Sequence, residues 1–587
     1  MIVKSDLSEE VSARLQCDVL VVGAGMAGLT AAIEAAERGA SVTVITKGPV
    51  TRDGAASWMA GSGFSAALYP PDSPEAHARD TIRVGQYLNR QDLLLALTNE
   101  IPRCLGLLDH WGMRYLKSEG KYVQVRFPGS RHNRVPRSIR NGIMLGPEYR
   151  RLFPKQLRRL GIRAMGDMQA LEILSRDGAA AGILALDAME GRFVAISAKA
   201  VVLATGGFMG MYPLTATSPT LVGEGVGMAY EAGAQVQDME FADFYSNSLA
   251  WPPMYAGSID LATMLRIDLN GKVFNSRGEE FLVAKKGSGL AQPVLCQQEI
   301  RSARCSPNGG VYLSFKHLPD NLIDAYLASM GDSRLLHSLG VMGIDIRRQA
   351  LEIAPAPLES MGGCRIDSRT RTNVPGLFAA GEVAGGAEGA FTIAGNPIAL
   401  DMAMGAIAGR ESASHAREAD QSTADLPNLA PSIEEALRPL REHSKNAIPA
   451  LEARRELQKV LGNQLHLLGR TRESLENAIG KIVSIRRDSR RWRVQTSART
   501  HNSEWMGCLE LRHMVTASEM VARAALARSE SRGLHYREDY PEPSPDWLCN
   551  IVLQREGDEM RVSRVPVEFP FMRPPEQQVP PAAKSPG

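Results

Sequence analysis

Three glycines near the start of the chain have the spacing needed to bind a phosphate group. They form the pattern Gly23-x-Gly25-x-x-Gly28. In such a pattern the first glycine permits a tight turn, the second lets a pyrophosphate approach the backbone, and the third lets helix and strand pack closely. The N–H groups and positive dipole end of the following helix would face the phosphates. The glycines therefore predict a dinucleotide-binding turn.

The segments around this turn match the elements that must position it. Residues 17–22 (CDVLVV) form an apolar, β-branched run typical of a buried parallel strand, and residues 41–46 (SVTVIT) form a second one. An alanine-rich helical pattern that closes at Gly39 lies between them. A complete β-α-β unit of about 30 residues makes the glycine pattern a strong signal. The second strand ends at Thr46-Lys47 instead of the acidic residue that binds ribose in NAD proteins, which weakens an NAD assignment more than dinucleotide binding in general.

Length and composition exclude several other classes of protein. A chain of 587 residues should divide into three or four domains of about 150 residues. The formal charge of +2 gives no support to nucleic-acid binding. The seven cysteines form no C-x-x-C pair, which argues against a metal site, a disulfide scaffold or an iron–sulfur cluster held by this chain alone. The first 16 residues lack a secretory apolar region, and no run of about 18 apolar residues occurs, so we expect a cytoplasmic protein without an integral membrane segment.

Five segments resemble the succinate dehydrogenase and fumarate reductase flavoprotein family, in the version found in L-aspartate oxidase. They are residues 46–68 (TKGPVTRDGAASWMAGSGFSAAL), 198–207 (AKAVVLATGG), 223–234 (GEGVGMAYEAGA), 372–383 (TNVPGLFAAGEV) and 530–541 (ESRGLHYREDYP). They occur in the family's order along nearly the whole chain. The resemblance implies an α/β fold, in which a Rossmann-like FAD-binding domain is interrupted by an α+β capping domain and followed by a C-terminal helical bundle.

The resemblance also implies how FAD is held. Glu382 follows a short strand, where open α/β sheets bind ligands, and the family's glutamate at this position contacts the FAD ribitol. Asn396 is a favourable N-cap and Pro397 suits the first helical position. In the family this helix N-terminus stabilises the negative charge of the reduced flavin near N1 and O2. The family's covalent histidine aligns with Ala56, so we expect non-covalent FAD. The predicted FAD contacts are Gly23, Gly25, Met26, Ala27, Gly28, Thr46, Lys47, Ser57, Gly61, Ser62, Gly63, Ala204, Thr205, Gly206, Glu224, Glu382, Asn396, Pro397 and Ile398.

The residues that act on substrate in the family are replaced. In relatives, two histidines and two arginines bind paired carboxylates and move a proton. Tyr245 and Leu358 stand at the histidine positions and Thr392 at one arginine position, while the other arginine aligns near Gln292-Pro293. A site without these cations cannot hold two carboxylates in the same pose. The sequence therefore predicts no succinate dehydrogenase, fumarate reductase or L-aspartate oxidase activity.

Other side chains could take over the chemistry. Tyr245 is a possible proton donor, and Thr392 lies between the segment 372–383 and the helix expected near Asn396. Residues 126–140 are densely cationic and resemble a loop near the family's active site, so His132 and Arg134 could receive an anionic substrate. The same loop could equally be a solvated basic segment. The catalytic candidates are Tyr245, His132, Thr392 and Arg134.

The predicted domain organisation follows the family's order. Residues 1–235 and 346–420 form a discontinuous FAD-binding domain, and residues 236–345 form the capping domain. Residues 433–545 carry helical periodicity and form a helical domain. A C-terminal arm follows at 546–571, and a disordered, proline-rich tail at 572–587.

The leading functional hypothesis is an FAD-dependent oxidoreductase that transfers a hydride between a small, anionic organic substrate and flavin N5. Electrons would pass to oxygen, a quinone or a protein carrier. The alternative is a flavoprotein electron-transfer subunit that needs an iron–sulfur partner, because residues 141–153 (NGIMLGPEYRRLF) resemble the adenylylsulfate reductase flavoprotein subunit. A third hypothesis is a flavin-binding module that has lost catalysis.

Overall fold

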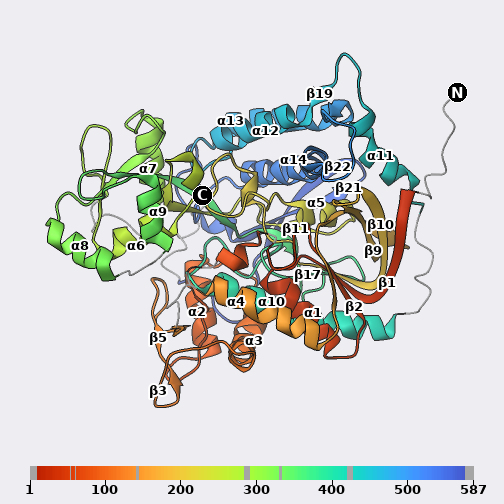
Figure 1. The fold of residues 1–587 in the computed structure, drawn as a ribbon, viewed down its shortest axis with the longest axis horizontal. Coiled ribbons are helices and arrows are strands. Elements are labelled where there is room, and N and C mark those ends of the chain that lie inside the picture. Colours follow the sequence, from red (N-terminus) through yellow and green to blue (C-terminus); the bar gives the residue numbers. More distant parts are fainter. Residues whose placement is uncertain are drawn as a thin grey trace, which may run out of the picture.

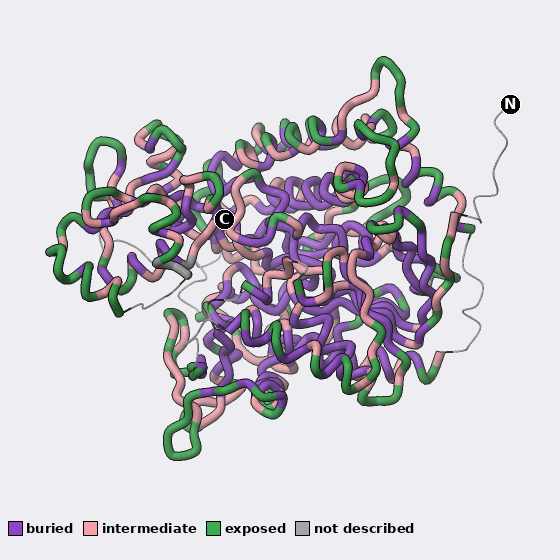
Figure 2. Tube along the Cα trace, viewed as in Figure 1, coloured by how far each residue is buried: buried purple, intermediate pink, exposed green. Residues whose placement is uncertain are grey.

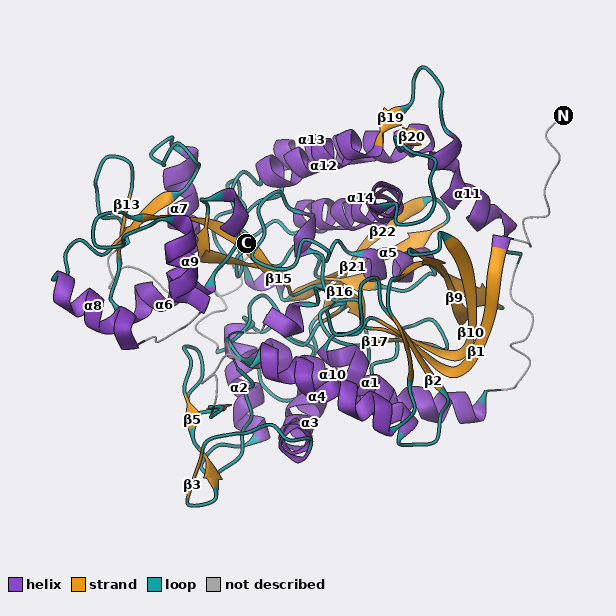
Figure 3. Ribbon diagram, viewed as in Figure 1, coloured by secondary structure: helices purple, strands orange, loops and turns teal. Residues whose placement is uncertain are grey.

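The structure is a computed structural model that describes residues 10–52, 54–59, 61, 63–139, 145–282, 291–329, 334–419 and 428–575. Helices pack against several β-sheets, so the fold is mixed α/β as predicted (Figure 3). Buried backbone is concentrated around the main sheet and the helices on either side of it (Figure 2).

Seven strands form the main sheet. They are β1 (Val11–Val22), β2 (Val42–Ile45), β7 (Arg163–Met165), β8 (Met168–Arg176), β9 (Ala179–Asp187), β10 (Arg192–Leu203) and β17 (Leu377–Ala379). The order is β7-β2-β1-β10-β9-β8, and β17 pairs in parallel with β10. The first four strands of this order are mutually parallel, so the carboxyl ends of β1, β2 and β10 meet at one edge. Parallel sheets bind ligands at this edge.

The predicted β-α-β unit is present, with one difference in length. β1 begins at Val11 and not near Cys17, because it pairs with β10 from the Val11–Phe193 position onward. The residues before Cys17 alternate between exposed and partly buried positions, unlike the buried end of the strand. A search for continuous apolar runs therefore detects only the second half of β1.

Helices cover the sheet on both sides (Figure 1). The helices below it in this view are α1 (Met26–Ala36), α3 (Gln91–His110), α4 (Gly146–Arg159) and α10 (Asn396–Glu418), with α2 (Pro74–Val84) beside them. α10 packs directly on α1. A Cβ added at Gly405 of α10 would lie 2.3 Å from the carbonyl oxygen of Ala27 in α1, so the two helices are in close contact there. This contact places the middle of α10 against the first turn of α1.

A separate group of strands and helices lies at the left of Figure 1. It has its own hydrophobic core, formed by buried residues between Leu249 and Ile353. Its antiparallel sheet contains β12 (Ala242–Leu249), β13 (Lys272–Phe274), β14 (Val311–Ser314) and β15 (Leu351–Ser360). Its helices are α6 (Asp260–Asp268), α7 (Ala291–Arg301), α8 (Asp320–Ser329) and α9 (Arg334–Met342). β12 begins and β15 ends next to the main body, so residues near Ala242 and Ser360 lie close to it.

The C-terminal part packs on the opposite side of the sheet from α1 (Figure 1). Its helices are α11 (Ala430–Arg441), α12 (Ala450–Gln464), α13 (Arg472–Arg487) and α14 (Ser503–Ala527), and α14 contacts α5 (Glu224–Glu231). A five-stranded sheet holds β11 (Val236–Gln237), β16 (Gly363–Arg365), β18 (Ala384–Gly385), β21 (Cys549–Glu556) and β22 (Glu559–Pro566). The short strands are β3 (Lys117–Ser118), β4 (Lys121–Tyr122), β5 (Gln124–Val125), β6 (Val135–Pro136), β19 (Ile448–Pro449) and β20 (Trp492–Arg493). Residues 576–587, most of the predicted disordered tail, lie outside the described residues.

No helix in the described part of the chain combines the length and the apolar character needed to cross a membrane.

Candidate functional site

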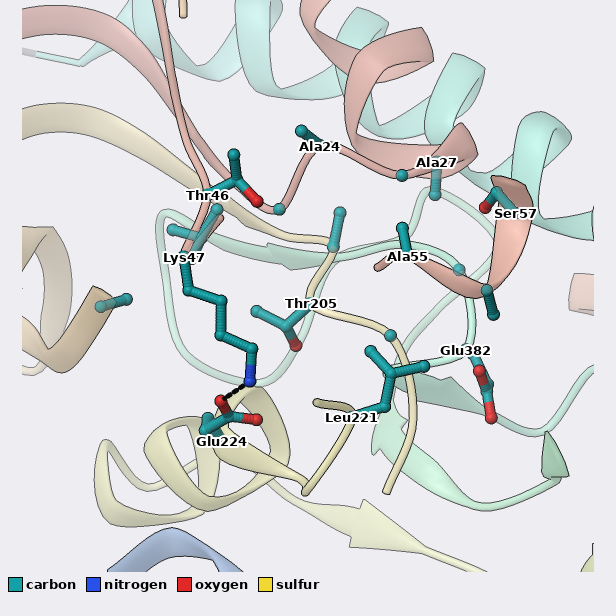
Figure 4. A pocket seen from close by; sticks show the side chains of 18 of the residues that line it. Ala24, Ala27, Thr46, Lys47, Ala55, Ser57, Thr205, Leu221, Glu224 and Glu382 are labelled. Atoms are coloured by element: carbon teal, nitrogen blue, oxygen red, sulfur yellow. Dashed lines mark hydrogen bonds and ion pairs between the residues drawn. The ribbon is translucent and has the colours of Figure 1, made fainter. Parts of the chain in front are cut away.

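A pocket opens at the edge where β1, β2 and β10 end (Figure 4). Its empty space amounts to about 830 Å³, part of which is open solvent. The predicted contacts that line it are Gly23, Gly25, Met26, Ala27, Thr46, Lys47, Ser57, Ala204, Thr205, Gly206, Glu224 and Glu382. The predicted contacts that do not line it are Gly28, Gly61, Gly63, Asn396, Pro397 and Ile398. Ser62 lies outside the described residues.

The glycine turn is built so closely that side chains would not fit. Gly23 has a φ of +114°, and a Cβ there would lie 2.1 Å from the Ala204 carbonyl oxygen. A Cβ on Gly28 would lie 2.1 Å from the Gly23 carbonyl oxygen. Gly28 thus sets the distance between α1 and the turn without lining the pocket. Its absence from the lining agrees with the packing role predicted for the third glycine.

The N-terminus of α1 presents unpaired donors to the pocket. Gly25 is its N-cap and supplies no side-chain capping bond, and the Met26 N–H donates to Ser57 Oγ at 3.0 Å. The next N–H groups have no intrahelical acceptor, as in the first turn of any helix. Thr205 Oγ1 also lies buried in the pocket lining without a hydrogen-bond partner. A bound pyrophosphate or ribose would satisfy such groups.

A partly buried lysine follows the end of β2, where NAD proteins carry an acid. Lys47 Nζ donates to Glu224 and, at 3.1 Å, to Glu510 Oε1 of α14. The dashed line in Figure 4 marks the Lys47–Glu224 pair. These two carboxylates raise the pKa of Lys47 although burial opposes the charge. Lys47 therefore links the pocket to the C-terminal helices as a charged group.

Glu382 lies at the far side of the pocket, beyond the end of β17 (Figure 4). Its Oε1 accepts hydrogen bonds from Ser360 N at 2.9 Å and Ser360 Oγ at 3.1 Å. Burial nevertheless raises the pKa of Glu382. Through these hydrogen bonds Glu382 connects the pocket lining to the end of β15.

Three further carboxyl groups, those of Asp243, Glu359 and Glu388, lie close to one another near Glu382. Asp243 of β12 and Glu359 of β15 are directly opposite each other in the antiparallel pair, so they share one face of the sheet. Both are partly exposed, although most of their neighbours in these strands are buried. Burial raises the pKa of Asp243 to about 7. Burial, together with the charges of Glu388 and Glu382, raises the pKa of Glu359 well above its usual range.

Glu388 completes this group from the turn before α10. It is 8 % exposed, and Thr392 Oγ1 donates a hydrogen bond to it. Burial raises the pKa of Glu388 to about 7, while hydrogen bonds from Thr392 and Glu359 act in the opposite direction. Asp243 and Glu388 can therefore change protonation near neutral pH, as acid–base catalysis requires, while the pKa of Glu359 is raised well above its usual range.

Two comparisons identify the family. Residues 18–398 match the family model described as an FAD binding domain, and residues 454–585 match the one described as fumarate reductase flavoprotein C-term. The chain is 33 % identical over 558 residues to a fumarate reductase (CoM/CoB) subunit of Methanothermobacter marburgensis, covering 94 % of this chain and 99 % of that protein. The chain belongs to the succinate dehydrogenase and fumarate reductase flavoprotein family. It is an FAD-dependent oxidoreductase of that family, as predicted.

Other members of the family match over similar lengths. An L-aspartate oxidase of Streptomyces coelicolor is 28 % identical, with 93 % of this chain and 92 % of that protein covered. The solved structure of Mycobacterium smegmatis Sdh1 in complex with UQ1 has a TM-score of 0.86 and 29 % identity, covering 95 % of this chain and 96 % of that chain. These matches confirm the predicted fold class and FAD as the cofactor.

One prediction about the flavoprotein's helix α10 was wrong. The N-cap is Gly395, in the left-handed conformation, and not Asn396. Asn396 is 1 % exposed and its side chain turns toward α2, where it contacts His77 Nε2 at 2.8 Å and donates to Thr81 Oγ1 at 2.9 Å. The helix therefore begins without a side-chain cap, and an Asn side chain that fastens two helices cannot also bond the helix end. Pro397 occupies the second helical position, because the helix begins at Asn396, and not the first position as predicted.

Arg134 of the basic loop is not a free cation. Arg134 is 2 % exposed and forms ion pairs with Asp72 at 2.7 Å and Asp80 at 2.8 Å. It is therefore a buried structural group and not an available catalytic residue, which corrects the prediction. His132 is partly exposed, and its backbone oxygen accepts a hydrogen bond from Ser130 Oγ at 2.8 Å.

Tyr245 and Thr392 lie on the carboxyl side of the site, together with an arginine that the sequence did not single out. Tyr245 follows Asp243 by two positions on β12, and Thr392 bonds Glu388. Arg266 of α6 donates to Asn247 Oδ1 at 2.5 Å, and its charge acts on Tyr245. Burial lowers the pKa of Arg266. The sequence could have pointed to Arg266 only as an arginine within residues 261–268, because no motif of the family is recognisable in that segment.

Proposed function

We propose that this chain moves a hydride between a small organic substrate and flavin N5, and that Glu359 and Glu388 handle the accompanying proton. The observation that carries the proposal is the contact between these two carboxyl groups beside Glu382, which lines the FAD pocket. Two carboxyl groups that share a proton have separated affinities for it, so one can donate while the other accepts.

FAD, when bound, supplies the two-electron acceptor. The glycine turn and the N-terminus of α1 would hold its pyrophosphate, and Glu382 would accept a hydrogen bond from its ribitol. Ala56 lines the pocket with a methyl group, which supports non-covalent binding. The start of α10 would stabilise negative charge on the flavin by its helix dipole.

The chain's own carboxyl groups would carry the acid–base step. Because the interaction with Glu359 lowers the pKa of Glu388, Glu359 acts as the hydrogen-bond donor and Glu388 as the acceptor. Glu388 would take the substrate proton during oxidation, and Thr392 would hold its carboxylate in place. Tyr245 lies on the same side and could position the substrate.

This arrangement also supports the prediction that succinate, fumarate and aspartate are not substrates. A dicarboxylate placed beside Asp243, Glu359 and Glu388 would meet acidic groups in place of paired cations, and its charge would disfavour their ionised forms. Arg134, one of the cations from which an anionic substrate was predicted, is already paired with Asp72 and Asp80, so it does not support that prediction.

The test is an anaerobic titration of the yellow protein with candidate amines, alcohols, hydroxy acids and dicarboxylates, followed by the visible flavin band. We expect no rapid bleaching by succinate or aspartate. The E359Q variant should lose most of the bleaching rate with an effective substrate, while the control E352Q should not. Glu352 lies on the same strand but is bonded to Ser306 and Asn308. Rapid bleaching by succinate would refute the proposal.

The electron acceptor, any partner chain and the cytoplasmic location stay predictions. Oxygen, a quinone and a protein carrier are distinguished by the reoxidation rate of the reduced protein with each. Full turnover of the isolated chain with oxygen or a soluble quinone would exclude the need for an iron–sulfur partner.

A further inference from the structure

A second cavity lies apart from the flavin pocket, between the main sheet, the C-terminal helices and the hairpin of β21 and β22. It is lined by residues of β8, β9, α5, α11, α13, α14, β20 and β21. Its volume is about 280 Å³, close to the lower end of the roughly 300–1,000 Å³ found for ligand pockets, which often lie at domain interfaces. Among the described residues, those that line this cavity and those that line the flavin pocket do not overlap. The cavity is therefore a separate candidate site.

Much of the cavity wall is apolar. The apolar lining residues are Leu171, Leu184, Ala436, Pro439, Leu509 and Val515. They come from β8, β9, α11 and α14, so apolar side chains contribute to the wall from several elements. Tyr230 of α5 and Trp492 of β20 add aromatic rings that are more than nine-tenths buried. A wall of this kind suits the apolar faces of a flat ring.

The charged side chains at the cavity are mostly paired within the protein. Three of its arginines have carboxylate partners, in the pairs Arg438–Glu435 at 2.6 Å, Arg512–Glu231 at 3.0 Å and Arg486–Glu519 at 2.5 Å. The other charged lining residues are Glu172, which is partly exposed, and Arg555 and Asp558, which are exposed on the hairpin. Exposed charges contribute little to binding, because water and salt screen them. The cavity therefore favours an uncharged ligand.

Trp492 offers a hydrogen-bond donor that lacks a partner. Its side chain is 3 % exposed, and Nε1 has no hydrogen-bond partner within the described residues. An indole N–H can only donate, and a buried donor without an acceptor has lost its hydration without replacement. A ligand oxygen or ring nitrogen in the cavity would supply the missing acceptor.

His513 of α14 offers an acceptor in the same cavity. Its ring is 3 % exposed, and Nε2 lies 3.1 Å from the carbonyl oxygen of Leu171. A carbonyl oxygen only accepts, so Nε2 carries the proton and Nδ1 has a free lone pair. In the part of the chain that the structure describes, Nδ1 has no hydrogen-bond partner, and Glu231 Oε1 lies 3.8 Å from it. Two acceptors at this separation can share one N–H group of a ligand.

We propose that this cavity is a second ligand site, which binds an uncharged, planar heteroaromatic compound. An N–H group of the compound bonds His513 Nδ1 and Glu231 Oε1, an acceptor of the compound bonds Trp492 Nε1, and the apolar side chains cover the ring. The inference goes beyond the proposed function, because hydride transfer belongs to the flavin pocket. The two sites meet along β8, where Ala170 lines the flavin pocket and Leu171 lines this cavity.

Binding is tested by calorimetry on the FAD-loaded protein, so that the flavin pocket is occupied. The probes are 2-quinolone and quinazolin-4-one, which are flat and uncharged and carry an N–H group beside an acceptor. Their N-methylated forms keep the ring and the acceptor but lack the donor, and quinoline-2-carboxylate carries a negative charge. We expect at least one of the two probes to bind, its N-methylated form to bind about tenfold more weakly or not at all, and the carboxylate to bind no better.

Two pairs of variants locate the bound probe. S432W places a large ring at a partly exposed lining position of α11 and should abolish binding, whereas E434W, at an exposed position of the same helix outside the lining, should leave it unchanged. W492F removes the N–H donor and should weaken binding about tenfold. W547F removes an indole outside both linings and should leave binding unchanged. Circular dichroism and the flavin content of each variant establish that it folds.

The outcomes separate this inference from the proposed function. Binding of an N–H probe that S432W abolishes and E434W retains would support the site. The inference fails if neither probe binds, if N-methylation leaves the affinity unchanged, or if binding survives S432W. Tighter binding of quinoline-2-carboxylate would also overturn it, since the arginines would then determine the charge of the ligand. A protein that takes up no FAD would refute the flavoenzyme proposal alone, because the probes can still be titrated into the apoprotein.

Discussion

The ion pairs of Arg134 allow a direct test of whether this side chain supports the fold or acts on substrate. Its Nη2 lies 2.7 Å from Asp72 and its Nη1 2.8 Å from Asp80, and all three side chains are largely inaccessible to solvent. Replacing Arg134 by Met would keep much of its apolar volume but leave two buried carboxylates without their shared cation. Asp80 would retain Arg83, while the structure gives Asp72 no other ion pair within the described residues.

The expected loss of stability is large. Breaking a buried ion pair by removing one partner costs about 3–5 kcal/mol, a factor of about a hundred to several thousand in the folding equilibrium. The control is R131M. The Arg131 side chain is 69 % exposed and lies 3.7 Å from Asp80, so its replacement should cost no more than about 1 kcal/mol. Urea unfolding followed by tryptophan fluorescence would compare the two variants with the parent protein.

The same experiment decides the role of Arg134. If the reasoning is correct, R134M shifts the urea midpoint strongly downward, and the protein that remains folded keeps its turnover rate per bound flavin. An R134M protein with unchanged urea stability and abolished turnover would refute the structural assignment and restore Arg134 as a catalytic candidate.

Three further predictions follow from single contacts. G28V should abolish FAD retention after gel filtration, because its Cβ would lie 2.1 Å from the Gly23 carbonyl oxygen, whereas G106A, at a helical position with no atom near the added methyl, should retain FAD. T205V should weaken FAD binding by about tenfold in a fluorescence titration, since it removes a buried hydroxyl whose partner we expect to be the cofactor; an unchanged affinity would contradict that role. Burial raises the pKa of Asp243 to about 7, so the folded protein keeps a proton that the unfolded chain loses near pH 4; this contribution to stability declines as pH rises from about 4 through 7, and D243N should flatten that part of the urea midpoint–pH profile.

The nucleotide site could be predicted from the sequence because its parts are local. Gly23, Gly25 and Gly28 lie within six residues, and their role depends on the strand and helix that flank them. The family motifs then extended the prediction to Glu382, which lines the same pocket after a long gap in the chain. Short-range geometry and a strict backbone requirement leave a clear pattern in the residues.

Side-chain partners over long distances left no such pattern. Asn396 has the residue type of an N-cap, but its place in the helix depends on His77 and Thr81, more than 300 positions away. Arg134 was predicted to be available because the loop around it is basic, whereas its partners, Asp72 and Asp80, lie in a different segment. In both cases residue type indicated what the side chain can do, and tertiary contacts determined what it does.

The charge of the substrate site shows the same limitation with a larger consequence. The sequence predicts that the family's cations are replaced, and a basic loop nearby then suggested an anionic substrate. The prediction of an anionic substrate treated Arg134 as a free cation. It also left out Glu359 and Glu388, which come from separate segments and meet only in the folded chain. Because an ion pair cancels a charge that composition still counts, the sign of a site is determined by its unpaired groups. The acids that act on Glu359, among them Glu382 and Asp401 of the pocket lining, come from segments far apart in the chain, so their combined charge could not be predicted from any one stretch of sequence.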